Sequence, residues 1–201
     1  MSLTMHGDLV ELMLNEQLVF SRALESTNLR TFGLFHYADQ TEAGLVPHGD
    51  FDIALELDVI HMEPCDAGGE SCVLLQTEFN DSLKSVSEIK YSIHSDGQRA
   101  AETQIRRARP DGSLAFDELQ TTKATGATLL RLARRGAIIY QIFQASKQTK
   151  PEVLGAMIIG TDPVPDGFLR TLIHTSGANR KTIVQYKSLE SLEVHADRII
   201  R

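Results

Sequence analysis

The chain has 201 residues, of which 42% are hydrophobic, and its 20 Lys and Arg against 27 Asp and Glu give a formal net charge of −7. This length and apolar content suit one domain with a substantial core over residues 1–201. The acidic balance argues against nucleic acid as a partner, because phosphate contacts need a basic surface. No apolar run approaches the roughly 20 residues of a membrane span, so we expect no membrane partner.

Residues 1–29 carry mixed signals. Asp8 followed by Glu11 resembles the capping box of a short helix, and that helix would have an apolar face. A strand over residues 17–22 is the alternative, and we expect a strand-rich segment with at most one short helix. No signal-peptide pattern is visible. A removed leader would leave no trace, so the compartment is left open, as is the oligomeric state.

The most regular strand pattern is FDIALELDVI, residues 51–60. Its residues alternate between an apolar face and a face that carries most of the polar ones. This period of two predicts a sheet with one buried and one wetter face. The apolar face holds Phe51, Ile53, Leu55, Leu57 and Val59, and the other face holds Asp52, Ala54, Glu56 and Asp58.

Other segments of strand character recur about every 8–14 residues, with turn residues such as Ser95-Asp96-Gly97 and Arg109-Pro110-Asp111-Gly112 between them. This spacing is typical of an antiparallel, two-sheet β-sandwich of the jelly-roll kind. The segments are 30–37, 72–79, 86–94, 98–107, 153–160, 168–174, 182–186 and 192–195.

Residues 125–144, TGATLLRLARRGAIIYQIFQ, predict a β-hairpin at the centre of this fold. The second arm, 137–143, is dense in β-branched and aromatic residues, which pack well on a pleated surface. The first arm, 129–133, is ambiguous alone, but its shortness and the following glycine favour a strand. Gly136 permits the positive φ that a tight hairpin turn needs.

Three stretches together resemble a known fold: Gly49–Ile53 (GDFDI), Leu130–Gly136 (LRLARRG) and Val184–Leu189 (VQYKSL). They are similar to concanavalin A-like lectin/glucanase sandwiches and, more narrowly, to an uncharacterised domain family abundant in planctomycete proteins. The resemblance covers roughly residues 30–200. It implies two curved antiparallel sheets, of which the concave one often carries a ligand groove. The narrower family brings no established activity.

The best catalytic candidates follow from this resemblance. Glu56, Asp58 and His61 are similar to the E-x-D-x-x-E signature of retaining glucanases with this fold, in which the first Glu is the nucleophile, the Asp tunes it and the second Glu is the acid/base. Residues two apart on a strand project to the same side, about 6–7 Å apart. That separation is close to the roughly 5–5.5 Å between the two carboxyl groups of retaining enzymes.

The departure from the signature is that His61 stands at the acid/base position. The nearest further carboxylate is Glu63, and regular pleating would turn it away from Glu56 unless a bulge brought it round. We therefore favour the simpler interpretation, in which Glu56 and Asp58 are polar residues of a half-buried strand.

No metal-ligand spacing occurs among the histidines, although His61, His94 and His174 could meet across strands. Calcium is common in the fold that the chain resembles, but no spacing singles out a set of ligands. The acidic residues in or near loops are Asp50, Asp52, Asp162 and Asp166. We expect no cofactor.

The cysteine and aromatic residues point to no particular function. Cys65 and Cys72 could form a small disulfide, but we favour two free thiols. The chain has no Trp and only 6% aromatic residues, so a stacking platform for sugar rings is weakly supported. The available rings are Phe35, Tyr37, Tyr91, Tyr140 and Phe143, and most fit a core better.

Arginines gather in two places that could bind an anion or an acidic partner. We favour instead solvated strand faces and turns that balance an acidic surface. The groups are Arg99, Arg106, Arg107 and Arg109, and then Arg131, Arg134 and Arg135.

Together these patterns predict a non-catalytic binding or interaction module, with a glycan as the candidate ligand and a carbohydrate or a protein as partner. One alternative is a glycoside-acting enzyme that uses Glu56 and Asp58, with His61 or Glu63 as proton donor. The other is a structural protein that self-associates through a sheet face or edge.

Overall fold

The computed structural model describes residues 2–6, 9–14, 17–23, 29–33, 49–64, 71–79, 81, 83–116, 120–159, 167–176 and 181–191, and all regular structure in these residues is β-strand. The predicted all-β fold is therefore confirmed. The helix considered for the N-terminus is wrong, because Leu9–Leu14 is a strand and Gln17–Ala23 is another. Among these residues, no helix could cross a membrane.

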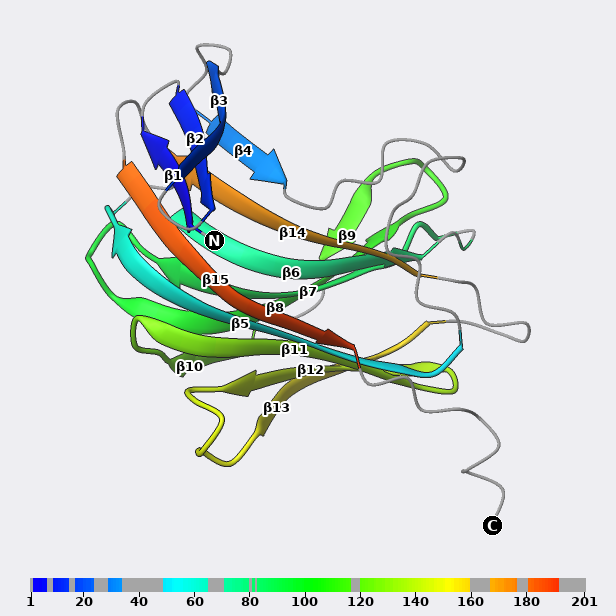
Figure 1. Cartoon of the computed structure of the whole chain (residues 1–201). Coiled ribbons are helices and arrows are strands. Elements are labelled where there is room, and N and C mark those ends of the chain that lie inside the picture. Colours follow the sequence, from blue (N-terminus) through cyan, green and yellow to red (C-terminus); the bar gives the residue numbers. More distant parts are fainter. Residues whose placement is uncertain are drawn as a thin grey trace.

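The strands form two antiparallel sheets that stack on each other (Figure 1). Sheet A has the order β13-β12-β11-β5-β15-β1-β2-β3, and sheet B has the order β10-β8-β7-β6-β14-β4, with β9 paired to β8. The bounds in sheet A are β13 Glu152–Ile158, β12 Ile138–Gln144, β11 Ala127–Arg135, β5 Phe51–Met62, β15 Lys181–Ser191, β1 Ser2–His6, β2 Leu9–Leu14 and β3 Gln17–Ala23. Those in sheet B are β10 Gln120–Lys123, β8 Arg99–Ala108, β7 Val86–Ile93, β6 Ser71–Phe79, β14 Gly167–Ser176, β4 Leu29–Gly33 and β9 Leu114–Phe116.

The core lies between the sheets and follows the alternation read from the sequence. On β5, all five residues of the predicted apolar face are buried in it. Side chains of β6, β7 and β11 meet them, including Leu75, Ile89 and Leu130. Each such side chain contributes roughly 1.5–3 kcal/mol when it leaves water, so this layer is the main source of stability.

The central hairpin is β11 and β12, which pair from Leu129 with Gln144 to Arg135 with Ile138. Gly136 has a φ of 56°, and the loop between the strands is Gly136 and Ala137. A glycine of positive φ at the first central position belongs to the tight turn whose twist matches that of the strands. The prediction of a hairpin over residues 125–144 is confirmed.

Both sheets bow in the same sense, and sheet B lies on the inner side of the bend (Figure 1). The outer face of sheet A is therefore convex. In sheet B both faces of the central strands are buried: all eight residues of β7 and eight of the nine in β6. One face belongs to the core, and the other face points away from sheet A.

A buried amide ties the two sheets together. Gln141 of β12 is fully buried, and its Nε2 donates to the carbonyl oxygens of Glu88 on β7 and Gln104 on β8, both at 3.1 Å. Gly155 faces it from β13, and a Cβ built on that glycine would lie 2.2 Å from Gln141 Oε1. A side chain at residue 155 would therefore force this buried amide to shift.

We predict that Gly155→Ala lowers the free energy of unfolding by about 1–3 kcal/mol, the usual cost of overpacking a core. Urea denaturation followed by circular dichroism measures it. The double variant Gly155→Ala with Gln141→Ala is the control. Because it removes the clash, its destabilisation should fall short of the sum of the two single variants, and strict additivity would contradict the account.

Candidate functional site

The predicted catalytic carboxylates lie on the outer face of sheet A, and both are held by lysines. Lys147 Nζ is 3.1 Å from Glu56 Oε2, and Ser188 Oγ donates to the same oxygen at 3.2 Å. Lys187 Nζ is 2.5 Å from Asp58 Oδ2, and this hydrogen bond raises the pKa of Lys187. The two side chains project to one face, as the alternation predicted.

A β-bulge at Ile60 changes where the next residues point. Val59 pairs with Val184 and His61 with Ile183, so Ile60 has no opposite residue on β15. Ile60 and His61 are both exposed, whereas Met62 is buried. Of the two alternatives considered for Glu63, the structure has the bulge. The bulge returns Glu63 to the outer side, where His61 Nε2 is 3.5 Å from Glu63 Oε1.

These four residues nevertheless do not gather around one point. Seven positions separate Glu56 from Glu63, which on an extended strand is roughly 20 Å. Glycosidases place their two carboxyl groups about 5–9.5 Å apart. Glu63 is also bound to β15, since its Oε2 accepts the backbone N–H of Lys181 at 2.7 Å. The catalytic role of Glu56 and Asp58 stays a prediction that this geometry, on a convex face, does not favour.

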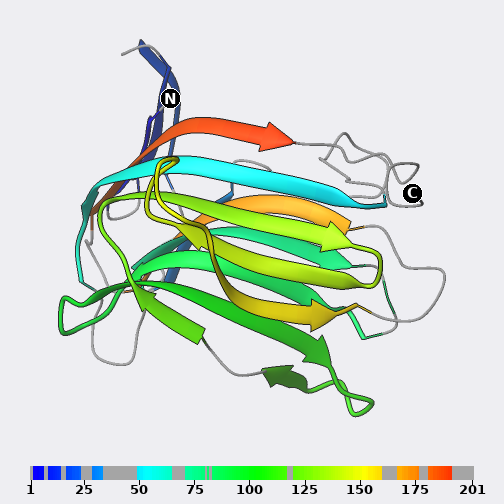
Figure 2. The same cartoon turned by 90° about the horizontal axis from the view of Figure 1, so that it is seen from below.

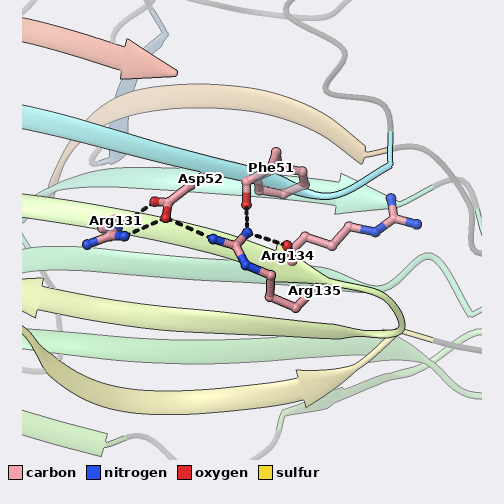
Figure 3. Close-up of polar contacts among 5 residues, drawn as sticks. All are labelled: Phe51, Asp52, Arg131, Arg134 and Arg135. Carbon is pink, nitrogen blue, oxygen red and sulfur yellow. Dashed lines mark hydrogen bonds and ion pairs between the residues drawn. The ribbon is translucent and has the colours of Figure 1, made fainter. Parts of the chain in front are cut away.

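Asp52, also on the outer face of β5, is the centre of the arginine cluster (Figure 3). The Nε and Nη2 groups of Arg131 both donate to its carboxylate, and Arg135 Nη2 lies 3.1 Å from Oδ2. Arg135 Nη1 also donates to the carbonyl oxygens of Phe51 and Arg134, both at 2.7 Å. The bond to Asp52 raises the pKa of Arg131. The cluster fastens the hairpin to β5.

These contacts favour a structural role for the LRLARRG arginines over an anion-binding patch, but the expectation of a solvated side chain is wrong for Arg134. Arg131 and Arg135 are engaged by Asp52, and Arg134 is buried and runs away from it (Figure 3). Asp50 is engaged too, since its Oδ1 accepts the Gly136 N–H at 2.6 Å. Both acidic residues considered for calcium in this region thus bind protein donors, whereas Asp162 and Asp166 lie outside the described residues.

The other arginine group is likewise occupied by protein atoms. Arg99 Nη1 donates to the Tyr91 hydroxyl at 3.2 Å, and Arg107 Nη2 donates to the Ile158 carbonyl at 2.9 Å. Arg109 lies on a turn beside Ser113. These contacts favour a structural role over an anion-binding patch for Arg99, Arg107 and Arg109. Arg106 is the fourth member of the group, and its contact is with Glu88.

The three histidines considered for a metal do not converge. His61 is on the outer face of sheet A, whereas His94 follows β7 and His174 lies on β14, both in sheet B. In the part of the chain that the structure describes, no three His, Cys, Asp or Glu side chains could hold an ion together. Cys72 is buried, and Cys65 lies outside that part, so their pairing stays a prediction.

Most of the described aromatic candidates belong to the core. Tyr91 and Phe143 pack between the sheets, while Tyr140 is half-buried on the outer face of sheet A. Phe35 and Tyr37 are outside the described residues. The preference for core over sugar platform therefore holds for two of the three rings that can be placed.

The structure adds a polar cluster that the sequence analysis missed, on the face of sheet B that points away from sheet A. Gln76 Nε2 donates to Glu88 Oε2 at 2.9 Å, and Arg106 Nη2 is 3.6 Å from that oxygen. Lys90 Nζ is 3.9 Å from Glu102 Oε2. Gln76, Glu88, Lys90 and Glu102 are all buried.

His94 completes this sheet B cluster at one end. Its Nε2 lies 2.8 Å from Glu102 Oε1, and 40% of its side chain is exposed, against 3% for Glu102. Arg106, with 31% exposed, has the same relation to Glu88. Each of these two solvent-reaching basic groups is therefore positioned by a buried carboxylate, as in sites where a buried acid orients a functional side chain.

A signal for the cluster was present in the sequence. In VSEIKYSIH, residues 86–94, charged and polar residues recur at every second position, and in residues 99–108 Glu102, Gln104 and Arg106 do the same. The sequence could not show that the two strands are neighbours in register, with Lys90 opposite Glu102.

The fold is a jelly roll that is similar to solved structures of several other proteins. An alginate lyase from Klebsiella pneumoniae superposes with a TM-score of 0.51 at 10% identity, over 74% of this chain and 61% of that one. A family 7 alginate lyase with bound product gives 0.51 at 10% identity, over 87% and 76%. A functionally unknown protein from Saccharomyces cerevisiae gives 0.55 at 10% identity, over 84% and 90%. At such identity the likeness shows the fold alone.

The particular family follows from the sequence. The chain belongs to the family described as "Protein of unknown function (DUF1583) C domain", whose model matches residues 39–201. Residues 1–51 match a second model, "Domain of unknown function (DUF1583_N)". No curated protein matches the sequence. The chain spans less than two thirds of the Klebsiella lyase.

We predict that Asp52→Asn destabilises the protein by about 2–3 kcal/mol, because two arginines lose the charge that holds them. Urea unfolding measures the change. Asp58→Asn is the matched control on the same face of β5, and since its partner Lys187 is at the surface we expect the unfolding midpoint to stay nearly constant. Equal losses in the two variants would refute the structural role given to Asp52.

Proposed function

We propose that this chain is a polysaccharide-binding module that holds its ligand on the sheet B cluster and does not cleave it. The observation that carries the proposal is the pair of solvent-reaching donors, His94 and Arg106, each oriented by a buried carboxylate on the concave side of the bend. Sugar hydroxyl and carboxyl groups are natural hydrogen-bond partners for an imidazole and a guanidinium.

The structural neighbours support the ligand class. Two of them are named as alginate lyases, and one of these holds its product. The resemblance noted in the sequence to lectin/glucanase sandwiches supports the same class, with the ligand on the concave sheet. A carbohydrate ligand therefore agrees with the fold, although the fold alone assigns no function.

Binding without cleavage is supported by the state of the carboxylates in the described residues. Glu88 and Glu102 are buried and already engaged by Gln76, Arg106 and His94. A general acid must reach the glycosidic oxygen. These two carboxylates instead hold basic groups that do reach solvent, which suits recognition better than acid/base chemistry.

We expect His94→Ala and Arg106→Ala each to weaken binding of a soluble polysaccharide about tenfold, the loss of one hydrogen bond to the ligand. Isothermal titration against a panel of acidic and neutral polysaccharides, alginate among them, measures it. Arg109→Ala is the control, because Arg109 lies on the exposed turn after β8 and contacts Ser113 instead of Glu88 or Glu102. Absence of binding to every polysaccharide in the panel would remove the proposal, and an equal loss for Arg109→Ala would remove its site.

A glycoside-acting enzyme remains the second candidate, because the bulge at Ile60 brings His61 and Glu63 to the face of Glu56 and Asp58. We expect no release of reducing ends from neutral glucans by the full chain. Should hydrolysis be measured, Glu56→Gln would identify its source. Loss of activity in that variant with an unchanged unfolding midpoint would establish the enzyme and exclude the module.

Two finer expectations stay proposals. The link to planctomycete proteins rests on the resemblance alone.

Self-association through a sheet edge is supported by Val153 and Ile158, which are exposed on the edge strand β13. Light scattering after size-exclusion chromatography at several concentrations separates a monomer from an assembly.

A further inference from the structure

The N-terminal strands complete both sheets. Strand β1 pairs antiparallel with β15 in sheet A, from Ser2 with Gln185 to His6 with Lys181. Strand β4 pairs with β14 in sheet B, from Leu29 with Ser176 to Gly33 with Leu172. Residues 2–33 thus contribute strands to the two layers of one sandwich, while β2 and β3 continue sheet A beyond β1.

This arrangement cuts across the division that the family models suggest. One model covers residues 1–51 and the other covers residues 39–201, as two domains in series would. The acceptor strands β14 and β15 both lie in the second model, and the strands that pair with them, β1 and β4, lie in the first. The hydrogen bonding therefore crosses the boundary twice, once in each sheet.

The N-terminal strands are joined to the rest of the described sandwich by only two strand pairings. Among the described residues, β1–β3 form a three-stranded ribbon whose pairing with the rest of the chain runs through β15 (Figures 1 and 2). β4 lies in the other sheet and pairs with β14. Three strands are the smallest number that can be stable by themselves, and only when they carry a hydrophobic face. An uncovered sheet edge, in turn, invites pairing with another chain.

We propose that the edges of β14 and β15 are strand-acceptor sites, and that residues 2–33 are their donor within the same chain. The segment matched by the N-terminal model is then not a separate domain, and the chain is one cooperative unit. The occupant of each edge is a strand of this chain. A strand from a second copy is the competitor that the experiment must distinguish.

The first test uses the full chain with Thr4→Pro, which removes a ladder hydrogen bond in a strand flanked on both sides. Thr4→Val is the matched control, because it keeps the backbone N–H and a β-branched side chain. We expect one unfolding transition whose midpoint falls by about 5 °C or more in the proline variant. The amide hydrogen-exchange rates of residues 181–185 should rise at least about tenfold in Thr4→Pro and should not change in Thr4→Val.

A two-step melt in which the main transition keeps its midpoint, or unchanged exchange at residues 181–185, would overturn the proposal, because the segment would then be an independent domain.

The second test separates donation within a chain from exchange between copies. Thr4 and Ile183 stand directly opposite each other, so the double variant Thr4→Cys with Ile183→Cys can cross-link β1 to β15. Peptide mapping without reductant identifies this bond despite Cys65 and Cys72. A disulfide within a monomer supports the proposal, and a disulfide-linked dimer contradicts it.

Discussion

Strands β6 and β7 are buried on both faces, and much of the structure follows from this constraint. One face can be apolar, and it forms half of the core. The other face carries Gln76, Glu88 and Lys90, and charged groups removed from water are tolerated only when they are paired. The neighbouring strand β8 supplies the pairing through Glu102 and Arg106. The sheet B cluster is therefore required by the burial before any function is considered.

Sheet A meets the opposite condition, since its outer face is convex and wetter. Its charges pair across strands, as Asp58 of β5 does with Lys187 of β15, or with a turn, as Glu56 does with Lys147 between β12 and β13. Asp52 is the exception because it is buried, and it takes two arginines from β11. On this face the ion pairs hold strands together, and on sheet B they also orient two side chains toward solvent. This difference is why we place the ligand on sheet B.

The sequence predicted the structural features that depend on residues close together along the chain. Alternation in residues 51–60 assigned both faces of β5, and Gly136 marked the hairpin turn that the structure has. The sequence did not predict the features that depend on how strands pair across the sheet. The bulge at Ile60 exists only against β15, some 120 residues away, and it moved Glu63 to the other face. Leu9–Leu14 has a helical pattern alone but is a strand beside β1 and β3. The sheet B cluster needs the register of three strands, which no single segment contains.

His61 and His94 lie on opposite outer faces of the sandwich, so they report directly on which face meets the ligand. The most direct measurement is the NMR spectrum of the two imidazole rings during a titration. A polysaccharide that the chain binds is added stepwise to the full chain. If the ligand lies on the sheet B cluster, the His94 resonances shift while those of His61 stay in place. A shift of His61 with His94 unchanged would contradict this placement and return the site to the face of Glu56 and Asp58.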